Sequence, residues 1–124
     1  MNFFYNPVRP GVVQEQEVIQ RIDSLNAAAQ DMISLAPAEG LDLSKRAYQL
    51  STSAEFRQVP YPKGVAEALY NMAHFHLEQG DAMLALAQAK EAQQLFTELQ
   101  IRSNQAATLR LLGMIYIQLN EYNK

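Results

Sequence analysis

Apolar residues recur at steps of three and four along most of this 124-residue chain, a spacing that places them on one face of an α-helix. Between positions 14 and 35 the recurring apolar residues are Val18, Ile22, Leu25, Ala29, Met32 and Ile33. A second stripe follows Pro37 and consists of Leu43, Ala47, Leu50 and Ala54. We therefore expect a helix over 14–35 and another from Pro37, since proline is tolerated in a first helical turn. Glycine inside a helix costs about 1 kcal/mol relative to alanine, so Gly40 leaves open that the second helix starts later than Pro37.

Two segments interrupt the helical spacing. The run VPYPKG at 59–64 cannot continue a helix, because each proline lacks a backbone donor and clashes with the preceding turn. The opening residues 1–13 show no period and contain the aromatic residues Phe3, Phe4 and Tyr5. We expect residues 1–13 to form an irregular arm, which either covers the first helix with these rings or extends as a flexible tail.

The second half of the chain carries one helical pattern twice, forty residues apart. Leu69, Met72, Ala73, His76 and Gly80 are followed at that distance by Leu109, Leu112, Gly113, Tyr116 and Asn120. The segment between the two copies has a stripe of its own, formed by Ala85, Ala89, Ala92 and Phe96. Self-similarity at a fixed spacing indicates an array of helical hairpins, in which each hairpin buries its apolar face against its neighbours.

The run from Ala66 to Phe96, which holds the first copy and this stripe, resembles a tetratricopeptide repeat, a helix-turn-helix unit with a basic period of about 34 residues. The resemblance implies an all-α fold: a right-handed superhelical array of antiparallel helix hairpins, with about five helices. A single domain at 14–124 would comprise a divergent unit (14–58), a repeat (65–100) and an incomplete repeat (104–124). Longer helices or a longer linker would absorb the extra six or so residues of each period. An ordinary amphipathic bundle is the simpler alternative.

Small residues are expected where two helices cross closely, because large side chains would hold the helix axes apart. Ala73 is expected to meet Ala85 within one hairpin, and Gly113 is expected to serve a further helix that this chain does not contain. His76 stands where the family usually has tyrosine. We expect it to be an interior or half-buried, hydrogen-bonded residue rather than a ligand.

The formal net charge is −3, and the ten lysines and arginines are scattered rather than gathered on one helix face. This distribution argues against a nucleic-acid partner. No apolar run approaches the roughly 18 residues that cross a bilayer. The absence of cysteine removes disulfides and thiolate chemistry. We expect a cytoplasmic protein without a membrane partner.

Catalytic patterns are absent from the sequence. All five glycines are isolated, so no phosphate-binding loop of a common type is present, and no serine lies in a nucleophile elbow. His74 and His76 are the only histidines, and residues two apart on a helix point about 200° away from each other. They therefore cannot share a metal ion from one face. We expect no enzyme activity, no metal and no cofactor.

Residues of the first helix of each hairpin that face away from the second are expected to line a concave groove for a protein or peptide. The predicted groove comprises Glu67, Tyr70, Asn71, His74 and Glu78 from the repeat, and Arg110, Leu111, Met114, Ile117 and Gln118 from the incomplete repeat. The apolar members among them, Leu111, Met114 and Ile117, have an equally good alternative place in the core.

The last predicted helix presents a second apolar face, formed by Leu109, Leu112, Tyr116 and Leu119. An uncovered apolar face favours association, so we expect either that the protein continues beyond Lys124 or that a second copy covers the face in a homodimer. In the first case the chain is similar to the long-period N-terminal regions of bacterial signalling proteins. The alternative function is then a sensory or regulatory segment ahead of a diguanylate cyclase, a histidine kinase or a transcription regulator.

Overall fold

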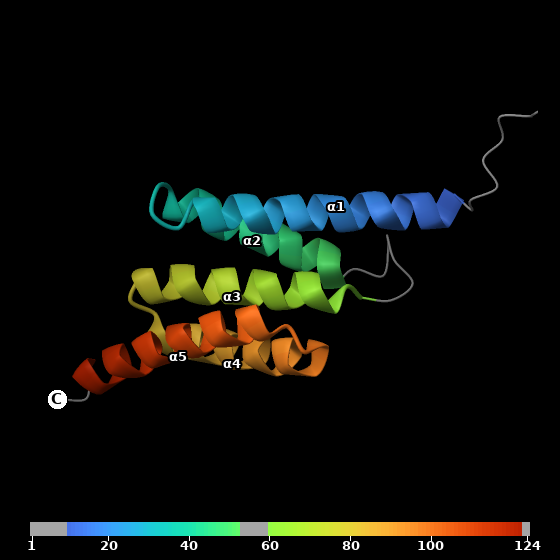
Figure 1. Cartoon of the computed structure of the whole chain (residues 1–124). Coiled ribbons are helices and arrows are strands. Elements are labelled where there is room, and N and C mark those ends of the chain that lie inside the picture. Colours follow the sequence, from blue (N-terminus) through green and yellow to red (C-terminus); the bar gives the residue numbers. More distant parts are fainter. Residues whose placement is uncertain (1–9, 53–59, 123–124) are drawn as a thin grey trace, which may run out of the picture.

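The computed structural model describes residues 10–52 and 60–122, and within these ranges the chain forms five α-helices and no strand (Figure 1). The helices are α1 (Pro10–Asp31), α2 (Pro37–Thr52), α3 (Pro62–Glu78), α4 (Ala82–Leu99) and α5 (Arg102–Tyr122). The expected all-α fold of about five helices is confirmed.

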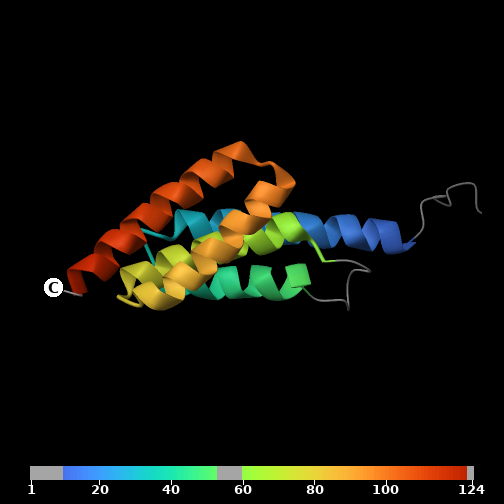
Figure 2. The same ribbon diagram turned by 90° about the horizontal axis from the view of Figure 1, so that it is seen from below.

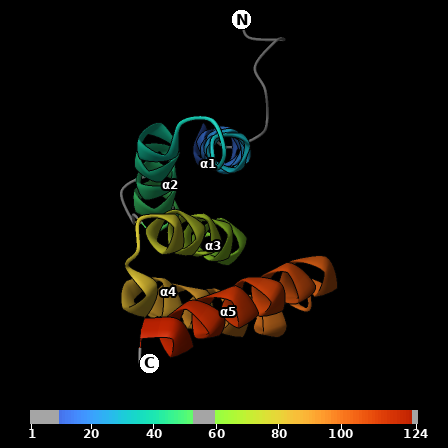
Figure 3. The ribbon, with the colours of Figure 1, turned by 90° about the vertical axis from the view of Figure 1, so that its left-hand side faces the viewer.

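Successive helices run antiparallel, and each packs against the next in the chain. Helix α3 lies at the centre of the stack, between the α1–α2 hairpin and the α4–α5 pair, and also contacts α1 and α5 (Figure 3). Figure 2 shows that α4 and α5 run obliquely to α1. The superhelical sense expected for such an array stays a prediction.

Prolines set the start of three helices, and this corrects two expected boundaries. Helix α1 begins at Pro10, so residues 10–13 form its first turn rather than part of an irregular arm. Helix α3 begins at Pro62, inside the segment expected to be a linker. A proline at the first helical position loses no hydrogen bond and already has a helical φ. The aromatic residues expected in the arm, Phe3 to Tyr5, lie outside the described residues.

The connections after α3 and α4 are short. Gly80 has a φ of 88° between α3 and α4, and the side chain of Asp81 accepts a hydrogen bond from the backbone N–H of Leu84 (3.3 Å), which caps α4. Between α4 and α5, Gln100 adopts the left-handed conformation with a φ of 58°. Longer helices, rather than a longer linker, therefore absorb the extra length of the forty-residue period.

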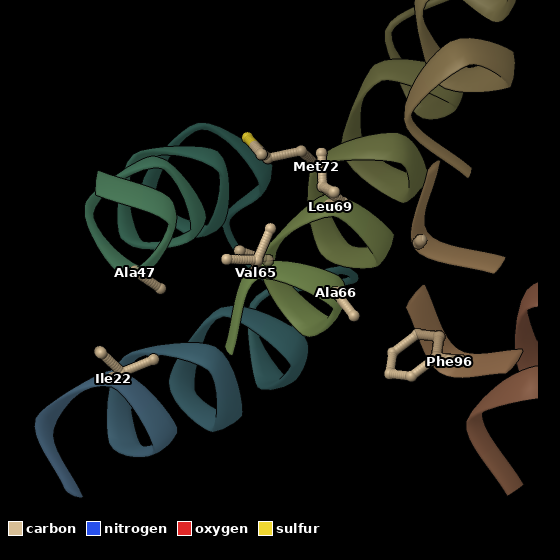
Figure 4. Close-up of a cluster of buried hydrophobic side chains, with 9 residues drawn as sticks. Ile22, Ala47, Val65, Ala66, Leu69, Met72 and Phe96 are labelled. Carbon is tan, nitrogen blue, oxygen red and sulfur yellow. The ribbon is translucent and has the colours of Figure 1, made fainter. Parts of the chain in front are cut away.

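The first core cluster joins α3 to α1, α2 and α4 (Figure 4). Its buried members are Ile22, Ala47, Val65, Ala66, Ala68, Leu69, Met72, Ala92 and Phe96. Val18 and Leu25 of the predicted α1 face pack against its edge. Most of these positions follow the helical spacing found in the sequence, so the predicted faces of α1 and α3 are confirmed.

The second core cluster joins α3, α4 and α5, and consists of Ala73, Leu77, Ala82, Ala85, Ala89, Leu111 and Ile115. Ala73 and Ala85 are fully buried together in it, as the small-residue pattern predicts. Beside this cluster, the Nδ1 atom of His76 donates a hydrogen bond to Oε1 of Gln88 on α4 at 2.7 Å. His76 is therefore an interior hydrogen-bonded residue, as expected.

The buried face of α2 differs from the predicted stripe. Its buried residues are Gly40, Ser44, Ala47 and Ser51, whereas Leu43 and Leu50 are only partly buried and Ala54 lies outside the described residues. Ser44 and Ser51 can be buried because each hydroxyl donates to a carbonyl four residues earlier, that of Gly40 (2.9 Å) and Ala47 (2.7 Å). The buried residues of this face are alike in having small side chains, not in being apolar.

Two glycines lie at close helix contacts. A Cβ atom on Gly40 would overlap the ring of Phe75 on α3, so Gly40 is a packing residue rather than a weak point of α2. A Cβ atom on Gly64 would lie 2.5 Å from Oγ of Ser51 on α2 and 2.7 Å from Cγ2 of Ile22 on α1. Gly64 therefore sets how closely α1, α2 and α3 approach one another.

The glycines provide a matched test of this packing. We expect Gly64→Ala to lower the free energy of unfolding by about 1–3 kcal/mol, because the added methyl group overpacks the junction. Gly113→Ala should raise it by about 0.5–1 kcal/mol, because nothing lies within 4 Å of the added atom and alanine favours the helix. Urea denaturation followed by circular dichroism would measure both changes. Equal effects of the two substitutions would contradict the assigned packing.

The left-handed residue at the end of α4 provides a second test. Gln100→Gly should raise the free energy of unfolding by roughly 1 kcal/mol, because glycine adopts this conformation without a Cβ clash. Gln79→Gly is the control, since Gln79 ends α3 in the right-handed region, with a φ of −81°. There glycine gains nothing and should destabilise the chain. Thermal unfolding of both variants would reveal whether the signs are opposite.

Candidate functional site

A cleft of about 120 Å³ opens between α1, α3 and the first turns of α5. Its lining residues are Gln30, Glu67, Tyr70, Asn71, Ser103, Asn104 and Ala107. In Figure 3, α1 and the N-terminal half of α5 lie on either side of α3, and these are the three helices that supply the lining residues. Three helices that are far apart in the sequence thus contribute to one polar surface.

Two buried asparagines fix the wall of the cleft between α1 and α3. The Nδ2 atom of Asn26 donates to the carbonyl of Gly64 (3.2 Å), and the Nδ2 atom of Asn71 donates to the carbonyl of Asn26 (3.1 Å). Both asparagines are almost fully buried. Since buried amides require hydrogen-bond partners, this pair favours one register of α1 on α3. Asn71 is therefore both a structural residue and part of the cleft lining.

Tyr70 of α3 is half-buried and lines the cleft. Its ring meets the ring of His74, one turn later on α3, edge to face with centroids 6.3 Å apart. Burial raises the pKa of the Tyr70 phenol, and the positive charge of Arg110 on α5 partly offsets that rise. The phenol is therefore neutral at physiological pH and available as a hydrogen-bond donor and acceptor.

Glu67 supplies a carboxyl group to the same cleft. Burial raises the pKa of Glu67, Lys63 one turn earlier lowers it, and the negative charge of Asp23 on α1 raises it further. The ionised form is thus poorly solvated in the free chain. A cation placed in the cleft would stabilise this carboxylate.

The predicted groove residues fall into four environments. Glu67, Tyr70 and Asn71 line the cleft, with His74 and Arg110 next to Tyr70. Glu78, Met114 and Gln118 share a separate depression of about 400 Å³ near the turn after α3. Ile117 is 62% exposed on α5, beside Met114 and Gln118 in a third depression. Leu111 is only 2% exposed and belongs to the second core cluster, so its core alternative holds and it lines no accessible groove.

Four lining residues were missed by the sequence analysis: Gln30, Ser103, Asn104 and Ala107. Ala107 follows Glu67 by forty residues, so shifting the predicted groove by the full repeat would have found it. Asn104 follows Gly64 by forty residues, so the second copy has a polar side chain where the first has none. No sequence signal marks Gln30, because α1 belongs to the divergent unit.

The residues predicted for self-association divide into two pairs. Leu109 and Tyr116 are exposed on the side of α5 away from the core. Leu112 and Leu119 are partly buried and pack against the second core cluster. The predicted face is therefore half covered by this chain and half open.

Two further observations concern the described residues alone. Among them, no group of three or more histidine, aspartate or glutamate side chains is arranged to hold a metal ion. None of the five helices combines the length and the apolarity needed to cross a membrane.

The raised pKa of Glu67 predicts a pH-dependent effect of its removal. The folded chain binds this proton more tightly than the unfolded chain, so the contribution of Glu67 favours folding at acidic pH and is lost as the pH rises through its raised pKa. Glu67→Gln should therefore raise the unfolding temperature at pH 7. The gain should shrink as the pH falls through the raised pKa and should be absent below about 4, where the carboxyl group of the unfolded chain is protonated as well.

Glu91→Gln is the control for net charge, since Glu91 is exposed on α4. Differential scanning fluorimetry across the pH range would compare the two variants with the wild type. A Glu67→Gln variant less stable than wild type at pH 7 would contradict the assigned environment of this carboxyl group.

Comparison with protein-family models, with curated proteins and with solved structures finds no match to this chain. The resemblance to tetratricopeptide repeats therefore depends on the residue pattern alone and stays a prediction.

Proposed function

We propose that the chain is a non-catalytic binding module of helical hairpins, similar to tetratricopeptide repeats, that holds an extended peptide between α1, α3 and α5. The observation that supports this most directly is the convergence of amide and phenol side chains from three helices on one cleft. A side-chain amide offers one acceptor and a pair of donors, which match the N–H and C=O groups of a peptide bond. Gln30 comes from α1 and Asn104 from α5, so a main chain laid along α3 would have a side-chain amide available from each of the two other helices.

The size of the cleft favours a peptide over a small-molecule ligand. Pockets for drug-sized molecules and cofactors measure roughly 300–1,000 Å³, whereas this cleft measures about 120 Å³. That volume suits one or two side chains of a longer segment whose main chain crosses the opening. The rest of such a segment would extend along α3 and α5 toward the depression at Glu78 and Met114.

The partly buried carboxyl group of Glu67 favours a basic residue in the peptide. Asp23 adds negative charge where α1 meets α3, while Lys63 beside Glu67 and Arg110 beside Tyr70 oppose it in part. The ring of Tyr70 lies in the same cleft, and an aromatic face attracts lysine or arginine through cation–π interaction. A bound cation would lower the pKa of Glu67, so affinity should decrease as the pH falls through that pKa.

Selection from a displayed library of random peptides, followed by fluorescence anisotropy with the recovered peptides, would test this proposal. We expect enrichment of extended sequences with a lysine or arginine, and at least roughly tenfold weaker binding, about 1.4 kcal/mol, to Tyr70→Ala and to Asn104→Ala. Glu67→Gln should weaken binding and remove its pH dependence. Glu67 and Asn104 line the cleft without belonging to a core cluster, so their variants should keep the wild-type circular dichroism spectrum. Tyr70 also packs against both core clusters, so the binding loss of Tyr70→Ala counts only if thermal unfolding shows that variant folded at the assay temperature.

The control variant is Met83→Ser, because Met83 is an exposed apolar residue on α4 that does not line the cleft. Recovered peptides should bind Met83→Ser and the wild type equally. Peptides that bind the cleft variants as tightly as the wild type, or a library that yields no enriched peptide, would refute the proposed binding site.

A further inference from the structure

Helix α5 has an exposed apolar face, here called the outer face, formed by Leu109, Gly113 and Tyr116. These residues follow Leu69, Ala73 and His76 of α3 by forty positions each. On α3, Ala73 is buried in a cluster with alanines of α4, and His76 is hydrogen-bonded to Gln88 of α4. Leu69 lies in the first core cluster, among residues of α1, α2 and α4, and Leu69 and His76 are only 4% and 9% exposed. On α5, Leu109 is 57% and Tyr116 49% exposed, and nothing lies within 4 Å of a Cβ atom placed on Gly113.

Helix α4 packs on α3 mainly through small side chains. The buried stripe of α4 consists mainly of alanines: Ala82, Ala85, Ala89 and Ala92. Small side chains on α4 let the large side chains of α3 fill the space between the two helix axes. The α3–α4 interface therefore shows which kind of helix fits this sequence pattern.

We propose that the outer face of α5 docks an amphipathic helix of a partner protein whose contact stripe consists of alanine or glycine at spacings of three and four residues. This face continues an established interface, because the adjacent Leu112 and Leu119 already pack on the core between α3, α4 and α5. The open space at Gly113 allows the two helix axes to cross closely there. The docked helix would pack on α5 in the way that α4 packs on α3.

A second copy of the chain fits this face less well than a partner helix. The small-residue stripes of α2 and α4 are both buried within the fold, so a second copy does not present either of them. Its own outer face would bring large residues, Leu109 and Tyr116, against the same large residues. The proposal is also independent of the cleft, because none of the outer-face residues lines it.

A labelled peptide with the sequence of residues 81–100, which carries the α4 stripe, is the probe for this proposal. Titrated with the full chain and followed by fluorescence anisotropy, it should bind saturably, and the double variant Leu109→Asp/Tyr116→Ser should bind it at least roughly tenfold more weakly. Both residues are exposed, so the double variant should keep its fold by circular dichroism. Met83→Asp, at an exposed position on α4, is the matched control and should bind as the wild type does.

A second peptide tests the small-residue stripe itself. With Ala85→Leu and Ala89→Leu the peptide keeps its helix propensity and gains apolar area, yet it should bind at least roughly tenfold more weakly, because leucines prevent close crossing at Gly113. Equal binding of both peptides, no saturable binding, or binding unaffected by the α5 variant would overturn the proposal. Light scattering that shows a dimer, converted to a monomer by Leu109→Asp, would assign the face to a second copy instead and would also overturn it.

Discussion

The close junction at Gly64 is the constraint on which the arrangement of the first three helices depends. Because Gly64 lacks a side chain, Ile22 of α1 and Ser51 of α2 can approach the backbone of α3 directly. The same residue accepts a hydrogen bond from the buried amide of Asn26. Steric fit and polar pairing thus meet at one position. The wall that α1 contributes to the cleft lies where it does because this junction holds α1 on α3.

The cleft combines structural and binding demands in neighbouring residues of α3. Asn71 is committed to the backbone of α1, whereas Glu67, one turn earlier, is held partly away from water beside the negative charge of Asp23. The ionised carboxylate of Glu67 lowers the stability of the folded chain slightly, and a positively charged ligand would offset this loss. Ionisable groups with a shifted pKa are frequent in binding sites, because a group that lowers the stability of the free protein can interact favourably with a ligand.

The two copies of the repeated pattern show how much burial depends on neighbours. Leu69 and Leu109 occupy the same place in the pattern, yet the first is core and the second is surface. Ala73 and Gly113 show the same contrast. Ala73 lies inside the second core cluster, whereas a Cβ atom placed on Gly113 would have no neighbour within 4 Å. One sequence pattern therefore yields a closed interface on α3 and an open one on α5. The difference comes from the neighbouring helices that cover this face of α3 and leave the corresponding face of α5 open, not from the residues of the pattern.

Hydrophobic periodicity was enough to predict that the chain is helical, that it has about five helices, and which faces of α1, α3 and α4 are apolar, because periodicity is a property of each helix alone. The position of Glu67, Tyr70 and Asn71 within the repeated pattern also marked them as candidate binding residues. Periodicity could not show that Leu111 is core, that α2 buries serines rather than leucines, or that Gln30 and Asn104 complete the cleft. These features depend on how closely the helices cross and at what angle, and small-residue contacts between distant segments set both.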